Sequence, residues 1–244
     1  MVSQTKITSK KAIQPTLEKL EALYQTGNQD DFWQLFETEL LQQRVKFPLL
    51  EFVAQALFSF VPPNEQLALI DRLLSLDYEG GYVIIGKLLQ ERLILNREEA
   101  VERAAACIVQ GDKWYVCDII GERVFGHGLL HGFAEMVGVI RPFLTHPNFW
   151  LQRSVGIATH YATKKGLPSD EVNQLFNLLL PLATSKQTDV KKGVGWAFKT
   201  IAKFYPELVR PQLQAILADK DVNPWCKNKL KVGLALAEER ARQV

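Results

Sequence analysis

The sequence predicts an all-α protein built as a helical-repeat solenoid. Apolar residues recur at helical spacing along nearly the whole chain, and the strict alternation of a half-buried strand is absent. Proline, glycine and asparagine clusters separate short helical segments, and about a dozen such helices are too many for one bundle. We therefore expect stacked helical pairs.

The predicted helices follow in order along the chain. In the first, residues 16–24, Leu17, Leu20, Leu23 and Tyr24 share one face. The later segments repeat this pattern over residues 30–43, 47–60, 64–76, 80–95, 97–109, 113–126, 128–144, 147–164, 168–182, 187–204, 206–218 and 223–241. The breaks between helices fall at residues 62–64, 111–112, 146–148, 166–169 and 223–224.

An internal repeat supports the stacking. Residues 151–156 and 190–195 align at a shift of 39 residues, each with an apolar residue, a basic residue two positions later, and then Val-Gly. Lys229 and Gly233 form a weaker third copy. A period near 40 residues with two helices per unit is typical of HEAT-like repeats, whose concave face is the usual binding surface. We expect residues 1–244 to form one such domain.

Charge is distributed unevenly. Residues 1–144 carry 14 Lys and Arg against 19 Asp and Glu, a net charge of −5, whereas residues 145–244 carry 15 against 8, a net charge of +7. Such asymmetry indicates a surface that faces a polyanion, although an uneven solvated surface would give the same numbers.

The ends and the cysteines indicate a soluble cytoplasmic protein. No apolar run reaches the roughly 18 residues of a membrane span, and the polar start has no signal-peptide core. Cys107, Cys117 and Cys226 include no CxxC pair, so we expect free, structural thiols.

The segment 187–204 carries an aromatic residue within a lysine stripe. Its apolar face contains Val190, Val194, Ala197, Phe198, Ile201 and Tyr205. The opposite face contains Lys192, Trp196, Lys199 and Lys203. Either Trp196 packs beneath a neighbouring repeat, or it is a platform for a sugar or base among lysines that neutralise phosphates.

The segment 147–164 has a similar second face. Trp150 lies on its apolar stripe, whereas Arg153, Gly156, His160 and Lys164 lie on the other. The planar fork of Arg153 suits bidentate contact with a phosphate. His160 is expected to be an exposed helix residue rather than a catalyst.

The segment 113–126 places an acid beside a tryptophan. Trp114, Asp118, Gly121 and Phe125 share a face. Either Asp118 caps or pairs with a neighbouring helix, or it is a perturbed carboxylate that stabilises developing positive charge and positions a nucleophilic water.

Metal and cofactor chemistry is not predicted. His127 and His131 are four residues apart but have no third ligand nearby, and the Gly-rich stretches lack a P-loop lysine.

Three segments together resemble the AlkD-like HEAT-repeat family of DNA alkylation repair glycosylases. Residues 114–118, WYVCD, resemble the family's W-D-x-V-D; residues 148–154, NFWLQRS, resemble N-x-W-L-x-R-x; and residues 192–196, KGVGW, resemble K-A-x-G-W. The resemblance covers roughly residues 95–215, with a looser match at residues 45–48.

The resemblance implies a glycosylase that hydrolyses the N-glycosidic bond of N3- or N7-alkylated purines in duplex DNA, without flipping the base. Trp114 and Trp196 would flank the lesioned nucleotide, Asp118 would stabilise the oxocarbenium-like sugar and orient water, and Arg153 would hold a phosphate. Lys164, Lys192, Lys199 and Lys203 would contact DNA. We expect a monomer without metal or cofactor.

The sequence also departs from the family pattern. Tyr115 stands where the family motif usually has an Asp, and Leu49, Leu50 and Glu51 follow Pro48 where relatives tend to be basic. The alternative is therefore a non-catalytic repeat protein that binds DNA or a protein partner.

Overall fold

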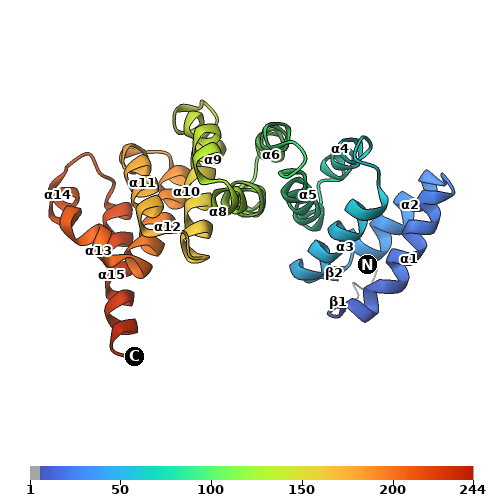
Figure 1. Ribbon diagram of the computed structural model, residues 1–244, viewed down its shortest axis with the longest axis horizontal. Helices are drawn as coiled ribbons and strands as arrows, with labels where there is room; N and C mark the ends of the chain where they lie inside the picture. Colours follow the sequence, from blue (N-terminus) through green and yellow to red (C-terminus); the bar gives the residue numbers. More distant parts are fainter. Residues whose placement is uncertain (1–5, 244) are drawn as a thin grey trace. The chain divides into compact units, whose positions relative to one another are not determined.

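The computed structural model describes residues 6–243 and is all-α, as predicted (Figure 1). The chain divides into two compact units, Met1–Arg97 and Glu98–Val244. Helices that follow one another and pack on their neighbours are consistent with a helical-repeat solenoid. Within the described residues, no helix has the length and apolar character needed to cross a membrane.

The first unit contains five α-helices among its described residues. They are α1 (Lys10–Gln25), α2 (Gln29–Phe36), α3 (Phe47–Phe60), α4 (Gln66–Leu76) and α5 (Glu79–Arg92), with the π-helical turn η1 (Glu37–Leu41) after α2. The short strands β1 (Lys6–Ile7) and β2 (Arg44–Val45) pair in parallel. The sequence predicts no strand, because two residues are too few to show an alternating pattern.

The second unit carries the residues predicted for function. Its elements are α6 (Arg97–Gly111), α7 (Trp114–Ile120), η2 (Gly121–Gly126), α8 (His127–His131), α9 (Phe133–Ile140), η3 (Arg141–Thr145), α10 (Phe149–Lys164), α11 (Ser169–Leu179), η4 (Pro181–Thr184), α12 (Thr188–Phe204), α13 (Pro206–Val209), η5 (Arg210–Gln212), α14 (Leu213–Ala218) and α15 (Pro224–Ala241).

Side-chain caps fix where the long helices of this unit begin. The Asn148 carboxamide oxygen accepts a hydrogen bond from the backbone N–H of Trp150 at 2.9 Å, and Asn223 does the same for Trp225 at 2.9 Å. Both asparagines thus satisfy an N–H that the first helical turn leaves free. The caps hold each tryptophan in the first turn of its helix.

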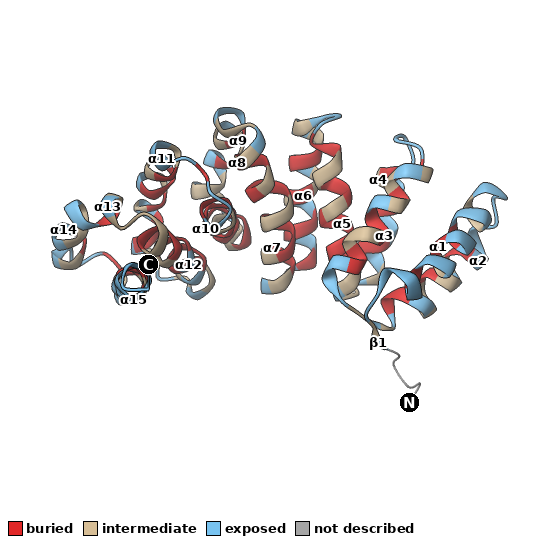
Figure 2. Ribbon diagram, turned by 60° about the horizontal axis from the view of Figure 1, so that its bottom comes forward, coloured by how far each residue is buried: buried red, intermediate tan, exposed pale blue. Residues whose placement is uncertain are grey.

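Glycines set the spacing of α10, α12 and α15, which pack side by side (Figure 1). A Cβ at Gly156 of α10 would lie 2.5 Å from the carbonyl carbon of Gly193 in α12. A Cβ at Gly195 would lie 2.7 Å from the indole nitrogen of Trp225 in α15. The helices therefore approach more closely than larger residues would permit, and their contact faces are buried (Figure 2).

Candidate functional site

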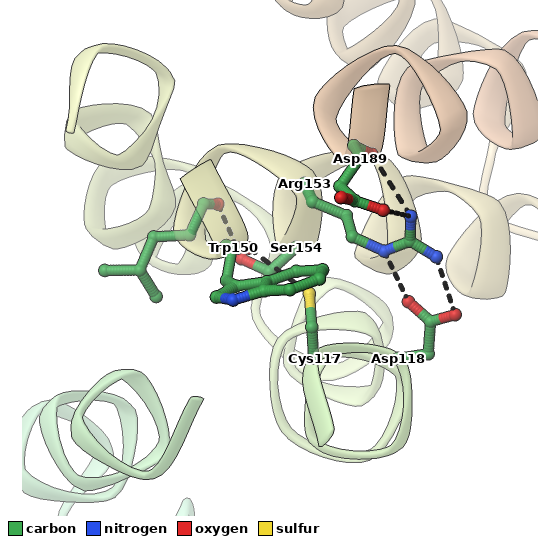
Figure 3. A network of polar contacts seen from close by, with 7 residues as sticks. Cys117, Asp118, Trp150, Arg153, Ser154 and Asp189 are labelled. Atoms are coloured by element: carbon green, nitrogen blue, oxygen red, sulfur yellow. Dashed lines mark hydrogen bonds and ion pairs between the residues drawn. The ribbon is translucent and has the colours of Figure 1, made fainter. Parts of the chain in front are cut away.

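Asp118 and Arg153 form a bidentate ion pair between α7 and α10 (Figure 3). The Nε and Nη2 groups of Arg153 donate to the two carboxylate oxygens of Asp118 at 2.8 and 2.9 Å. Asp118 therefore pairs with a neighbouring helix, as one of its two interpretations predicts. The two parallel hydrogen bonds fix both the position and the rotation of the carboxylate.

A second acid, from α12, completes the network. Nη1 of Arg153 donates to the backbone carbonyl of Asp189 at 3.1 Å and lies 3.7 Å from its carboxylate. The pKa of Asp118 is raised, chiefly by burial and also by the charge of Asp189. The hydrogen bonds and the charge of Arg153 act in the opposite direction and lower it. The guanidinium thus offsets part of the cost of holding a carboxylate in a largely buried position.

The prediction that Arg153 lies on a face opposite the core is wrong. Its side chain is buried, and the residue is only 2% exposed. A single-helix projection gives one core face, but α10 has helices on two sides, so the second face of Arg153, Gly156 and His160 packs toward α12. Lys164 remains exposed. Because its donors are engaged by Asp118 and Asp189, Arg153 has a positioning geometry rather than that of a phosphate clamp.

Two exposed tryptophans lie near the ion pair. Trp114 begins α7 one helical turn before Asp118 and is 57% exposed. Trp196 is 36% exposed, and its ring centroid lies 5.7 Å from the guanidinium carbon of Arg153. The structure therefore gathers Asp118, Arg153 and Trp196 into one cluster and presents aromatic surface to solvent beside it.

His160 supports Trp196 and is not the exposed residue that we expected. Its Nδ1 lies 2.6 Å from the hydroxyl oxygen of Thr200, and its ring centroid lies 6.0 Å from that of Trp196. Burial, with the charges of Lys164 and Lys199, lowers the pKa of His160 to about 4. A neutral imidazole therefore packs beside the tryptophan at neutral pH.

The four predicted DNA-binding lysines keep their charge available. Lys164 and Lys192 are exposed, whereas Lys199 and Lys203 are half-buried. Within the part of the chain that the structure describes, none of them lies within ion-pair distance of a carboxylate. Positive charge without an ion-pair partner next to Trp196 favours an anionic ligand.

The cysteines are free and buried, as predicted. The thiol of Cys117 donates to the carbonyl oxygen of Trp150 at 3.2 Å, and burial raises its pKa. Sequence reasoning missed Asp189 as a partner of the site. The available signal was the pair of glycines, Gly156 and Gly193, which permit two helices to pack closely.

A protein-family model described as DNA alkylation repair enzyme matches residues 16–228, most of the chain. No curated protein and no solved structure gives a significant match.

Proposed function

Because the chain belongs to the DNA alkylation repair enzyme family, we propose that it is a glycosylase for N3- or N7-alkylated purines in duplex DNA. The observation that carries the proposal is the carboxylate of Asp118, fixed by Arg153 and lying among partly exposed tryptophans. Alkylation at N3 or N7 makes the purine cationic, so the base leaves readily. The enzyme then has to stabilise the positive sugar that remains.

In this proposal Asp118 stabilises the positive sugar. As the C1′–N bond breaks, its electron pair leaves with the base and neutralises it, and positive charge develops on the deoxyribose. A fixed carboxylate stabilises that charge without having to reorganise. Water then forms the new C1′–O bond and loses its proton to solvent, and Asp118 is placed to orient it.

The neighbouring residues have supporting roles in the proposal. Trp114 and Trp196 pack against the deoxyribose, while Lys164, Lys192, Lys199 and Lys203 neutralise phosphates. Arg153 holds Asp118 in place instead of binding phosphate. We also propose excision without flipping the base into a pocket, as the family resemblance implies.

The test is release of 3-methyladenine or 7-methylguanine from methylated duplex DNA. Asp118→Asn keeps the side-chain volume and removes the charge, so we expect base release to fall about 100-fold or more. DNA binding by the same variant should persist. Release by the wild type that does not exceed a heat-inactivated control would overturn the proposal.

A second candidate is a DNA-binding protein without glycosylase activity. The observation that favours it is the ion pair itself. A bidentate Arg153–Asp118 contact that merely joins α7 to α10 would have the same geometry. This candidate predicts salt-dependent DNA binding, no base release by the wild type, and equal binding by Asp118→Asn.

A further inference from the structure

A third exposed tryptophan lies on α15, next to the predicted lysine stripe of α12. Trp225 is 37% exposed, and its indole lies over Gly195, the residue immediately before Trp196. Only a glycine at 195 leaves room for this arrangement, because a Cβ there would come within 2.7 Å of the indole nitrogen. Trp225 therefore lies against α12 at the residue that precedes Trp196 in the sequence.

The backbone around Trp225 is held firmly. The side chain of Asn223 caps α15 and donates to the carbonyl of Ser185 at 3.3 Å, and the backbone N–H of Asn223 donates to Ala183 at 2.9 Å. The next residue, Cys226, is fully buried. A half-exposed ring on so firmly held a turn is a preorganised contact surface.

A cation accompanies this ring. The ammonium of Lys229 lies 4.3 Å from the centroid of Trp225, and it has no acidic partner among residues 6–243. Lys192, exposed on α12 three residues before Gly195, is also unpaired within that range. An aromatic face flanked by unpaired lysines matches a sugar–phosphate strand, which offers both an apolar face and negative charge.

We propose that Trp225 and Lys229 form a second DNA contact, which holds the backbone of the same duplex a short distance from the nucleotide at Trp196. The choice of DNA rests on the proposed function. Packed helices lie about 8–10 Å apart, which corresponds to two or three base-pair steps of about 3.4 Å measured along the duplex axis. The contact therefore acts on binding and register rather than on the bond that breaks.

The first test measures binding of an undamaged duplex by fluorescence anisotropy. Trp225→Leu should weaken binding about tenfold, and Lys229→Gln should reduce the slope of log K against log salt by about 0.9. Lys231→Gln is the matched control, since it removes one exposed lysine from another face of α15. Thermal unfolding of each variant checks that the fold is intact. Unchanged affinity in folded Trp225→Leu, or a slope in Lys229→Gln equal to that of Lys231→Gln, would overturn the proposal.

The second test locates the contact on the DNA. Single phosphates on each side of an abasic site are replaced in turn by neutral methylphosphonates, and affinity is compared between the wild type and Lys229→Gln. We expect one position, two or three nucleotides from the abasic site, where the replacement weakens only the wild type. Equal effects on both proteins at every position would contradict the contact.

These measurements separate the two proposals. A wild type that binds duplex DNA through Trp225 and Lys229 but releases no base would refute the glycosylase and leave this contact standing. Base release by a wild type whose DNA affinity does not depend on Trp225 or Lys229 would support the glycosylase and refute this contact. Capture of a protein instead of DNA, with no measurable duplex binding, would overturn the contact.

Discussion

At the scale of single residues, the site depends on one buried arginine that serves two acids. Arg153 donates to both oxygens of Asp118 and to the carbonyl of Asp189, so it links α7, α10 and α12. Removing one member of a buried pair typically costs about 3–5 kcal/mol, because the other charge is left alone. The geometry of the guanidinium is therefore as important as its charge.

Arg153→Lys separates geometry from charge. Lysine keeps the positive charge but cannot make the two parallel hydrogen bonds. Because Arg153 lowers the pKa of Asp118 against the effects of burial and Asp189, we expect that pKa to rise. The acid limb of base release should move to higher pH and kcat should fall about tenfold or more, with KM less affected. A pH–rate profile unchanged in shape would mean that Arg153 only joins the helices.

His160 gives the fold a dependence on pH. Its pKa is about 4 in the folded protein and about 6.5 when unfolded. Between these values the unfolded chain binds more protons, so stability rises with pH and is lost as pH falls from about 6.5 to 4. Lys164, Lys199 and Thr200 face the ring.

The variant His160→Gln tests this pH dependence, because glutamine does not titrate but can keep a hydrogen bond to Thr200. We expect the wild type to lose of order 1–3 kcal/mol between pH 7 and pH 4.5 relative to the variant, measured by urea unfolding at each pH. Parallel stability curves for the two proteins would contradict the assigned role.

At the scale of elements, the sequence predicts the long helices closely and the short breaks less well. The predicted segment 47–60 coincides with α3. The segment 128–144 instead divides into α8, α9 and η3, because the backbone is extended at Gly132 and Pro142 lacks an N–H. The spacing of apolar residues shows which face of a helix is buried. It carries little information on where a helix ends when the apolar pattern continues past that end.

The candidate site was predictable in part for the same reason. The sequence places Trp114, Asp118 and Trp196 through their spacing on individual helices. The burial of Arg153 and its contact with Asp189 depend on the approach of α12 to α10, which two glycines permit. A projection of one helix identifies only its most apolar face. It therefore cannot show that the second face of α10, which carries Arg153, packs against α12.

Gly156→Ala tests this approach. The added Cβ would meet the backbone of Gly193, so we expect destabilisation of about 1–3 kcal/mol, together with reduced base release as Arg153 shifts. The control is Gly138→Ala in α9, where a Cβ meets nothing within 4 Å. That change should stabilise by up to about 1 kcal/mol. Urea unfolding measures the free energy of unfolding of both variants. Similar changes in Gly156→Ala and Gly138→Ala would show that the packing of α10 on α12 does not need Gly156.

At the scale of the whole chain, a net charge of +2 conceals an acidic part and a basic part. The described lysines beside Trp196 and Trp225 lack acidic partners, so their charge is available to a ligand. Residues 1–144 carry a net charge of −5, so apart from Trp114 and Asp118 we expect them to contribute little to binding a polyanion. This division predicts that the salt dependence of DNA binding originates in residues 145–244.

The double variant Lys192→Gln with Lys199→Gln tests where the salt dependence originates. If both lysines neutralise phosphates, the slope of log K against log salt should fall by about 1.8, since each contact contributes about 0.9. The matched control is Lys11→Gln with Lys19→Gln, two exposed lysines of α1. Because α1 lies in the acidic part, we expect the slope of log K against log salt for this control to equal that of the wild type. Equal reductions of the slope in both variants would place DNA contacts on α1 as well, and would contradict the assignment of binding to residues 145–244.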